Sequence, residues 1–175
     1  LVAAVLLCSV FLSACRTSDE IRSVSSDSVS SSVAEVLQAL PDLSEFAVLF
    51  INVGKADAAV LRFGDVTVLV DTGSESSAPQ LIAGLNLLGV TRIDALFLTH
   101  SHSDHIGGLD ALCANYAVSM VYSPFFSEQN KDGEGKIVNR CEKLSLPHTE
   151  LKAGESVAVT DDVSFSVLGP LELNE

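Results

Sequence analysis

Apolar and polar positions divide the chain after residue 45 into segments with strand-like and helix-like periods. Phe46–Val53 is apolar on both faces, which is typical of an interior strand. Ala58–Phe63 and Val66–Val70 flank the two-residue turn Gly64-Asp65 and predict a hairpin. The globular part of the chain is therefore expected to begin with β-structure.

Helix-like and strand-like segments alternate in the remainder of the chain. From Ala78 the apolar positions recur at helical spacing, with Pro79 suited to the first turn and Gly89 to the end. The pattern then predicts, in chain order, a strand over Ile93–Thr99, a helix from after His105 to about Tyr116, a strand over Val118–Tyr122, a polar loop over Ser123–Gly135, a helix over Lys136–Leu144, and a hairpin of Val157–Thr160 with Val163–Leu168. This alternation is typical of an α/β fold.

The first 45 residues have a different character. Leu1–Ala14 carries no charge and is too short to span a bilayer, but it has the length of a signal-peptide core, of which the beginning would be missing. It ends in Leu12-Ser13-Ala14-Cys15, which resembles a bacterial lipobox and implies cleavage before Cys15 and lipidation of that cysteine. An ordinary buried helix is the alternative. Residues 15–45, with eight serines between Ser18 and Ser32, predict a tether that contains a short helix.

Charge narrows the choice of partners. The chain of 175 residues has a formal net charge of −13, and its first charged residue is Arg16. An acidic surface disfavours tight binding of nucleic acid through phosphate contacts, although a local basic groove or bound metal ions would override this. The length permits a single domain, which we place at residues 46–175.

Candidate chemistry gathers in one stretch, Thr99–Gly108, which reads Thr-His-Ser-His-Ser-Asp-His-Ile-Gly-Gly and holds three of the chain's four histidines. Alternate residues of extended backbone point the same way, so His100, His102 and Asp104 are expected to converge on one side. His105 would approach as the chain turns into the next helix. Imidazoles and a carboxylate are good ligands for divalent transition metals, and this many can serve two adjacent ions. A polar loop whose histidines only hydrogen-bond one another is the alternative.

These residues resemble the signature of the metallo-β-lactamase-fold hydrolases, H-x-H-x-D-H followed by Gly-Gly. Together with Phe50–Ala58 and Val68–Gly73, they are similar to the hydrolase domain of ComEC-type DNA-uptake proteins. That family usually shows D-V-G-Q-G-D at the first place, where this chain has Asn52, Lys55 and Ala56 in place of Asp, Gln and Gly. The resemblance implies a metallo-β-lactamase-type αβ/βα sandwich, with only the N-terminal half and the start of the second half present.

The resemblance also implies roles for individual residues. His100 and His102 would bind one divalent ion, and Asp104 and His105 a second, with Zn or Mn as the metal. Asp71, at the end of a strand, would orient a metal-bound histidine. Asp71 and Asp104 are thus the candidate catalytic carboxylates.

Other side chains receive weaker assignments. Asp57 is expected to brace its loop rather than bind metal. His148 is interpreted as a surface histidine, with a third-ligand role as the alternative. Cys113 and Cys141 fall in predicted helices, where two unpaired thiols are preferred over a disulfide. Serines beside the histidines lack a G-x-S-x-G elbow, which argues against a serine hydrolase.

These observations predict an extracytoplasmic metal-dependent hydrolase, lipid-anchored to the bacterial cell membrane, in which a metal-bound hydroxide attacks the substrate. The ComEC resemblance implies a phosphodiester, either small or in extracellular nucleic acid, and the net charge disfavours the latter. Hydrolysis of a lactone, ester or β-lactam, or a non-catalytic binding lipoprotein that retains the fold, are the alternatives. The family's remaining ligand motifs would be expected beyond Glu175, so we expect the 175 residues alone to be inactive and poorly stable. The pattern leaves the oligomeric state open.

Overall fold

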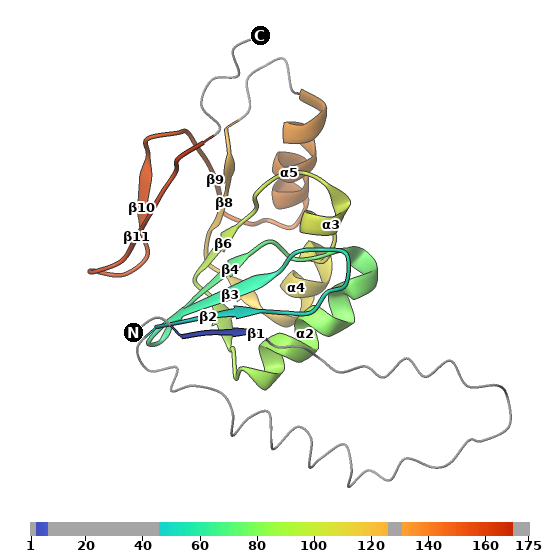
Figure 1. The fold of residues 1–175 in the computed structure, drawn as a ribbon. Helices are drawn as coiled ribbons and strands as arrows, with labels where there is room; N and C mark the ends of the chain where they lie inside the picture. Colours follow the sequence, from blue (N-terminus) through green and yellow to red (C-terminus); the bar gives the residue numbers. More distant parts are fainter. Residues whose placement is uncertain (1–2, 7–45, 126–130, 170–175) are drawn as a thin grey trace, which may run out of the picture.

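The computed structural model describes residues 3–6, 46–125 and 131–169 (Figure 1). Strand β1 (Ala3–Leu6) comes from the apolar N-terminal run and pairs in parallel with β2 (Phe46–Phe50). The rest of the expected signal peptide, the Cys15 lipidation site and the serine-rich tether lie outside the described residues, so these remain predictions. Among the helices of the described ranges, none has the length and apolar character that crossing a bilayer requires.

A mixed sheet of seven strands runs through the described part of the chain in the order β1-β2-β3-β4-β6-β8-β9. β3 (Ala59–Phe63) and β4 (Val66–Val70) are antiparallel with Phe63 opposite Val66, which confirms the hairpin around Gly64-Asp65. From β4 onward the pairing is parallel, through β6 (Ala95–Phe97), β8 (Val121–Pro124) and β9 (His148–Leu151). The carboxyl ends of β4 and β6 therefore lie side by side, and the loops that follow them meet.

Two predicted strands are each divided in the structure. The strand expected over Ile93–Thr99 is split at Asp94 into β5 (Arg92–Ile93) and β6, and that expected over Val118–Tyr122 becomes β7 (Ala117–Val118) and β8. β5 and β7 form a separate two-stranded sheet. The break has a polar cause, because Asp94 Oδ2 accepts the Thr67 N–H at 2.8 Å and its own N–H donates to Thr67 O at 2.9 Å.

Helix α2 (Ala78–Leu87) is confirmed, with Pro79 in its first turn and Gly89 at φ +65° after its end. The helix expected after His105 was predicted wrongly as one piece: α3 (Ser103–Ile106) is a single turn that already contains His105, and α4 (Leu109–Asn115) follows it.

The polar loop expected over Ser123–Gly135 was wrong at both ends, because β8 continues to Pro124 and α5 (Lys131–Lys143) already begins at Lys131. Its two glycines suggested a loop, each costing about 1 kcal/mol in a helix. Ile137 and Cys141 of α5 are each only 1% exposed against the core, and their burial stabilises the longer helix.

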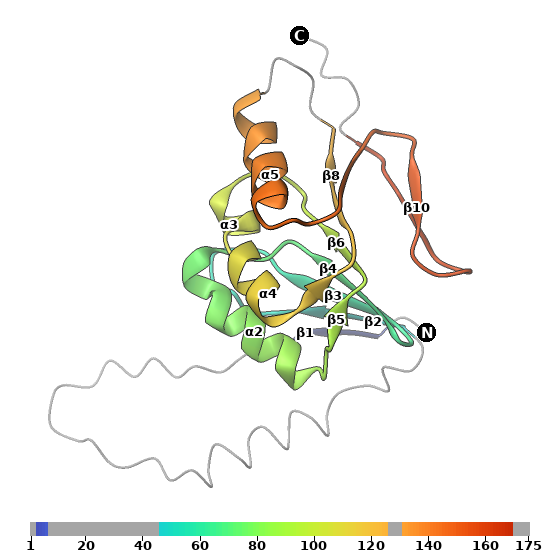
Figure 2. The same ribbon diagram turned by 180° about the vertical axis from the view of Figure 1, so that it is seen from behind.

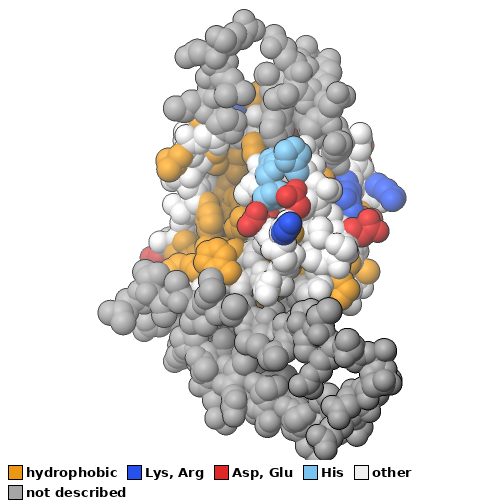
Figure 3. Space-filling view, turned by 45° about the vertical axis from the view of Figure 1, so that its right-hand side comes forward, with side chains coloured by type: hydrophobic (Ala, Val, Ile, Leu, Met, Phe, Trp, Pro, Cys, Tyr) orange, Lys and Arg blue, Asp and Glu red, His pale blue; other side chains and the backbone are white. Residues whose placement is uncertain are grey.

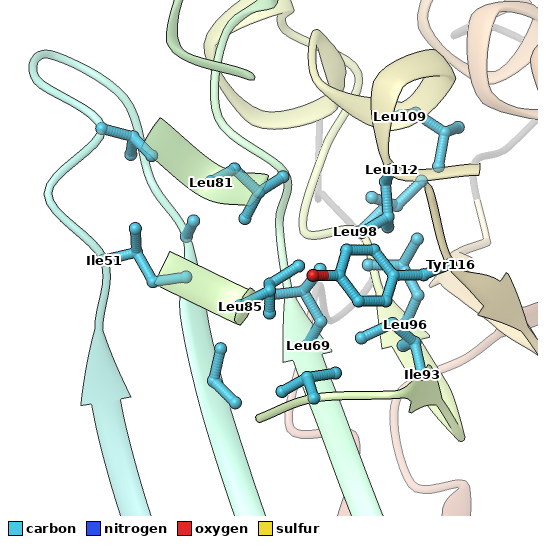
Figure 4. Packing of buried hydrophobic residues seen from close by; sticks show 14 of the residues in the cluster. Ile51, Leu69, Leu81, Leu85, Ile93, Leu96, Leu98, Leu109, Leu112 and Tyr116 are labelled. Carbon is cyan, nitrogen blue, oxygen red and sulfur yellow. The ribbon is translucent and has the colours of Figure 1, made fainter. Parts of the chain in front are cut away.

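All the helices cover one face of the sheet, as the front and back views agree (Figure 1, Figure 2). Between them lies a core of interlocking aliphatic side chains (Figure 4). Its largest fully buried members come from sheet and helices alike: Leu49, Leu69, Leu81, Leu85, Ile93, Leu96, Leu98, Leu109, Leu112 and Ile137. Tyr116 closes it at one side, where its hydroxyl donates to Asn86 Oδ1 at 2.7 Å. This core holds α2 and α4 against the strands whose ends carry the histidine loop.

The opposite face of the sheet carries a row of aromatic rings. Phe97 stacks on Tyr122 at 4.9 Å between ring centroids, and Phe46 on Phe63 at 5.0 Å. The predicted hairpin is confirmed as β10 (Ser156–Ala158) and β11 (Ser164–Ser166), and it places Phe165 on Phe97 at 4.7 Å. Both faces of the sheet are therefore apolar, as expected of an inner layer of a sandwich.

Candidate metal centre

Backbone hydrogen bonds tie the end of β4 to the histidine loop. The Asp71 N–H donates to Phe97 O at 2.9 Å, and the Thr72 N–H donates to His105 O at 2.7 Å. The Thr72 hydroxyl reinforces the second contact with a 3.0 Å bond to the same carbonyl. Because these groups are paired away from solvent, the two loops keep a fixed spacing.

The Gly-Gly pair allows the histidine loop to lie close against the chain that follows β4. A Cβ on Gly108 would collide with the carbonyl oxygen of Thr72, and one on Gly107 with the backbone of Ser103 and Glu75. Both glycines have ordinary negative φ angles, −63° for Gly107 and −79° for Gly108. Lack of space, and not backbone conformation, therefore requires glycine at these positions.

Asp71 holds His105 in one orientation. Its side chain is buried, with Oδ1 accepting the Thr99 N–H at 2.8 Å and Oδ2 accepting the Thr99 hydroxyl at 2.6 Å. Oδ2 also lies 2.7 Å from His105 Nδ1. Since a carboxylate only accepts, Nδ1 carries the hydrogen and Nε2 of the neutral ring keeps its lone pair. This is the orienting contact expected of a carboxylate behind a metal ligand.

Two carboxylates face that Nε2 atom. Asp57 Oδ2 lies 3.5 Å from it and Asp104 Oδ2 lies 3.9 Å away. Asp57 does brace its loop, because its N–H donates to Asp104 O at 3.3 Å and its carbonyl accepts from Gly73 at 2.9 Å. Its carboxylate also faces the site, which the sequence analysis missed; the available signal was an acid at the end of a turn between two strands.

His100 and His102 form a second donor pair. His100 Nε2 lies 3.0 Å from His102 Nδ1, a separation that fits a hydrogen bond between neutral rings. It is also close to the spacing of about 3.4 Å between two nitrogens that share a tetrahedral ion. The His100 ring lies 3.8 Å from the His105 ring between centroids, so the two pairs are neighbours.

The four candidate ligands do not converge in the way that the sequence predicted. Extended alternation brings His100 and His102 together, but Asp104 lies in the turn of α3 and meets His105 instead. Within the described ranges, no group of three or more His, Cys, Asp or Glu side chains is gathered closely enough to hold one ion. The donors thus meet in pairs whose chemistry suits divalent metals, and the ligand roles of these four residues remain predictions.

Local electrostatics favour a neutral ring at His100. The pKa of His100 is lowered by burial and by the neighbouring His105 and His102, while Asp71 and Asp104 act in the opposite direction. A neutral imidazole is the form that binds a metal ion.

The remaining candidate residues lie elsewhere. The ring of His148 is half-buried in β9, with Nε2 2.8 Å from the hydroxyl of Ser123, and burial lowers its pKa. It is therefore bound to the sheet and is not freely exposed, and among the described residues it makes no hydrogen bond to the histidine loop. Cys113 and Cys141 are free, as preferred, and burial raises the pKa of Cys141 to about 11.

The two groups of candidate ligands, His100 with His102 and His105 with its facing carboxylates, lie on one face of the molecule. Figure 3 shows the histidine side chains gathered there, with acidic side chains directly beside them, a basic side chain against these acids and other basic side chains on the flank. Asp104 and Asp57 are reachable by solvent, with 48% and 74% of their side chains exposed, whereas His105 is 14% exposed. The site thus combines a rigid buried support with accessible ligand atoms.

Comparison with known proteins places this geometry in a family. The family model of the metallo-beta-lactamase superfamily matches residues 51–158, which include every residue of the candidate centre. The chain is 30% identical over 147 residues to ComE operon protein 3 of Bacillus subtilis (strain 168), a match that covers 73% of this chain and 18% of the relative. It is 36% identical over 76 residues to competence protein ComA of Neisseria gonorrhoeae, covering 43% of this chain and 11% of the relative.

Among solved structures, a peroxy diiron species of the chemotaxis sensor ODP aligns with a TM-score of 0.52 at 14% identity, covering 72% of this chain and 49% of that one. This likeness supports the fold alone. The chain spans less than a fifth of the length of ComE operon protein 3 and of competence protein ComA. With a match over most of its length and the histidine signature inside the matched region, the chain belongs to the metallo-beta-lactamase superfamily, whose members are generally metal-dependent hydrolases.

Proposed function

We propose that this protein hydrolyses phosphodiesters with two divalent metal ions, Zn or Mn, held by His100, His102, Asp104 and His105. When bound, such ions supply Lewis acidity and lower the pKa of water. The protein's own part is to present ligand atoms at fixed positions and to favour the neutral ring of His100. The proposal deepens the family assignment, which leaves the substrate open.

The buried contact between Asp71 and His105 is the observation that carries the proposal. A buried carboxylate that fixes the tautomer of a partly exposed histidine has no evident purpose in a scaffold, because burying a charge costs free energy unless its hydrogen bonds repay it. Here the contact leaves His105 Nε2 free and directed toward two carboxylates. That arrangement suits a ligand and not a core histidine.

The resemblance to ComEC-type hydrolase domains supports this substrate class, as do the matches to ComE operon protein 3 and competence protein ComA. A net charge of −13 favours a small phosphodiester over long nucleic acid, whose phosphates would be repelled along most of the surface. The lipobox-like ending before Cys15 supports an outward-facing, lipid-anchored location. Loss of membrane association in a Cys15→Ala variant would test the anchor separately.

Metal analysis and turnover by the full-length protein test the central proposal. We expect bound Zn or Mn and hydrolysis of bis-p-nitrophenyl phosphate in preference to nitrocefin and p-nitrophenyl acetate. His102→Ala should lower kcat/KM by about two orders of magnitude or more, the scale seen when charge stabilisation is removed from a transition state. His148→Gln is the matched control, since it alters the one histidine outside the loop.

Preference for nitrocefin or the neutral ester would replace the phosphodiester with the alternative substrates. Absence of both metal and turnover would contradict the enzymatic proposal and favour a binding lipoprotein. Equal losses in His102→Ala and His148→Gln would show that the histidine loop has no special role.

A further inference from the structure

A hollow of about 480 Å³ opens beside the histidine loop. It is lined by Ser101, His102, Ser103, Asp104, Ile106 and Arg140. The first five belong to the loop and α3, and Arg140 reaches the hollow from α5. Arg140 is the single cationic side chain in this lining.

The guanidinium of Arg140 is fixed from behind. Its Nε donates to Asp110 Oδ2 at 2.8 Å, and Nη2 donates to the same carboxylate and to Gly107 O at 3.3 Å. The side chain is 27% exposed. Nη1 takes part in none of the hydrogen bonds among the described residues, so its two N–H groups remain available. A guanidinium held in place loses little entropy when it binds a ligand.

Two serine residues line the same hollow. Ser101 and Ser103 alternate with the histidines and line the hollow, and within the described part of the chain neither hydroxyl is hydrogen-bonded to another residue. Together with Nη1 they supply donors of the kind that bind an oxyanion. The carboxylate of Asp104 is the opposing charge, so an anion is expected on the Arg140 side of the hollow.

We propose that Arg140, with the hydroxyls of Ser101 and Ser103, forms an anion subsite that holds a non-bridging oxygen of a substrate phosphate beside the metal ligands. The inference rests on the proposed function and names the recognised group. It makes Arg140 a specificity-determining residue that favours anionic phosphodiesters over neutral esters. The contact with Asp110 then serves to aim the guanidinium.

The test is binding of inorganic phosphate to the full-length protein by isothermal titration calorimetry, together with KM for bis-p-nitrophenyl phosphate. Arg140→Gln should weaken phosphate binding and raise KM by about tenfold or more, the scale of a lost charge-assisted pair, with kcat within about threefold. KM for p-nitrophenyl acetate should not change. Arg92→Gln is the matched control, because Arg92 also pairs with an aspartate, Asp94, but lies on β5.

A second variant separates binding from support of the fold. Asp110→Asn removes the ion pair but keeps the positive charge, so it should lower Tm as Arg140→Gln does but weaken phosphate binding much less. If both variants lower Tm equally and neither changes phosphate affinity, Arg140 only joins α5 to α4 and the subsite is wrong. Absence of phosphate binding by the unaltered protein would also overturn it.

The two proposals fail in distinguishable ways. Phosphate binding that depends on Arg140, without turnover of any substrate, would support the subsite and contradict the hydrolase. Turnover that is unaffected by Arg140→Gln would support the hydrolase and contradict the subsite.

Discussion

Oδ2 of Asp71 lies 2.7 Å from Nδ1 of His105, although the two residues are 34 positions apart in the chain. Asp71 adopts φ +58°, a left-handed conformation that aspartate and asparagine tolerate better than most residues. This turns the carboxylate from the end of β4 toward the histidine loop, where Thr99 also donates to it. The contact between Asp71 and His105 therefore connects the end of β4 to the candidate ligand atoms of the histidine loop.

Removing the Asp71 carboxylate should affect stability and metal binding differently. Asp71→Ala leaves the Thr99 donors without their acceptor, and we expect the free energy of unfolding to fall by about 2–4 kcal/mol. Asp71→Asn keeps the shape and tolerates the backbone angle but removes the charge. It should weaken zinc affinity by about 10–100-fold. Urea unfolding and zinc titration measure the two effects.

Asp94→Asn is the control for Asp71→Asn, because Asp94 also accepts a backbone N–H, from Thr67, but lies far from the histidine loop along the strand. Zinc affinity should be unchanged in this variant. If all three variants bound zinc as the unaltered protein does, Asp71 would have no part in orienting His105.

Gly108→Ala should destabilise the protein by at least about 2–3 kcal/mol, because the added methyl group collides with the rigid backbone carbonyl of Thr72. Gly84→Ala in α2 is the comparison: its methyl would meet side-chain atoms of Ile51 at 3.0–3.3 Å, which a shift of a few tenths of an ångström relieves. The gain in helix propensity of about 1 kcal/mol offsets the crowding, so little change is expected. Similar Tm values for the two variants would contradict this account of the loop.

Acidification should destabilise the fold through His148. Burial lowers its pKa from the ordinary value of 6.5, so the unfolded chain binds more protons than the native one as pH falls through that value. The stability that the neutral ring contributes is present above the unfolded pKa and is lost at lower pH. His148→Gln, which keeps a nitrogen near Ser123, should lose less stability between about pH 7.5 and about pH 5.5 than the unaltered protein. Chemical denaturation at both pH values measures the difference; parallel curves would show that His148 does not contribute.

Cys141 should be unreactive in the folded protein. Its pKa is raised to about 11 by burial and by the neighbouring Cys113. The thiolate is therefore about one part in a thousand at pH 8, and the thiol is also shielded from reagent. Iodoacetamide should modify Cys141 only after denaturation, as peptide mass spectrometry would reveal. Rapid modification of the native protein, or a peptide linking Cys141 to Cys113, would refute this.

Much of the fold could be predicted because it is encoded by local patterns. The hairpin at Gly64-Asp65 and the helix between Pro79 and Gly89 follow from turn chemistry and apolar spacing, and both are confirmed. The strand break at Asp94 could not be predicted, since its partner is Thr67 on a strand distant in the sequence. The early start of α5 was missed for the same reason: packing of Ile137 onto the core outweighs the local preference of its glycines.

By itself, the sequence determined which chemical groups are concentrated at the histidine loop and that this loop ends a buried strand. It also indicated the superfamily, because a run of ligand types at fixed spacing is a local property of the chain. Only the tertiary structure decided how those groups are paired: His100 with His102, His105 with Asp71, and the carboxylates of Asp57 and Asp104 facing His105 Nε2. The physical reason is that hydrogen bonds and close contacts depend on distances in space, and parallel pairing of β4 with β6 brings distant residues together in a way that no local pattern records.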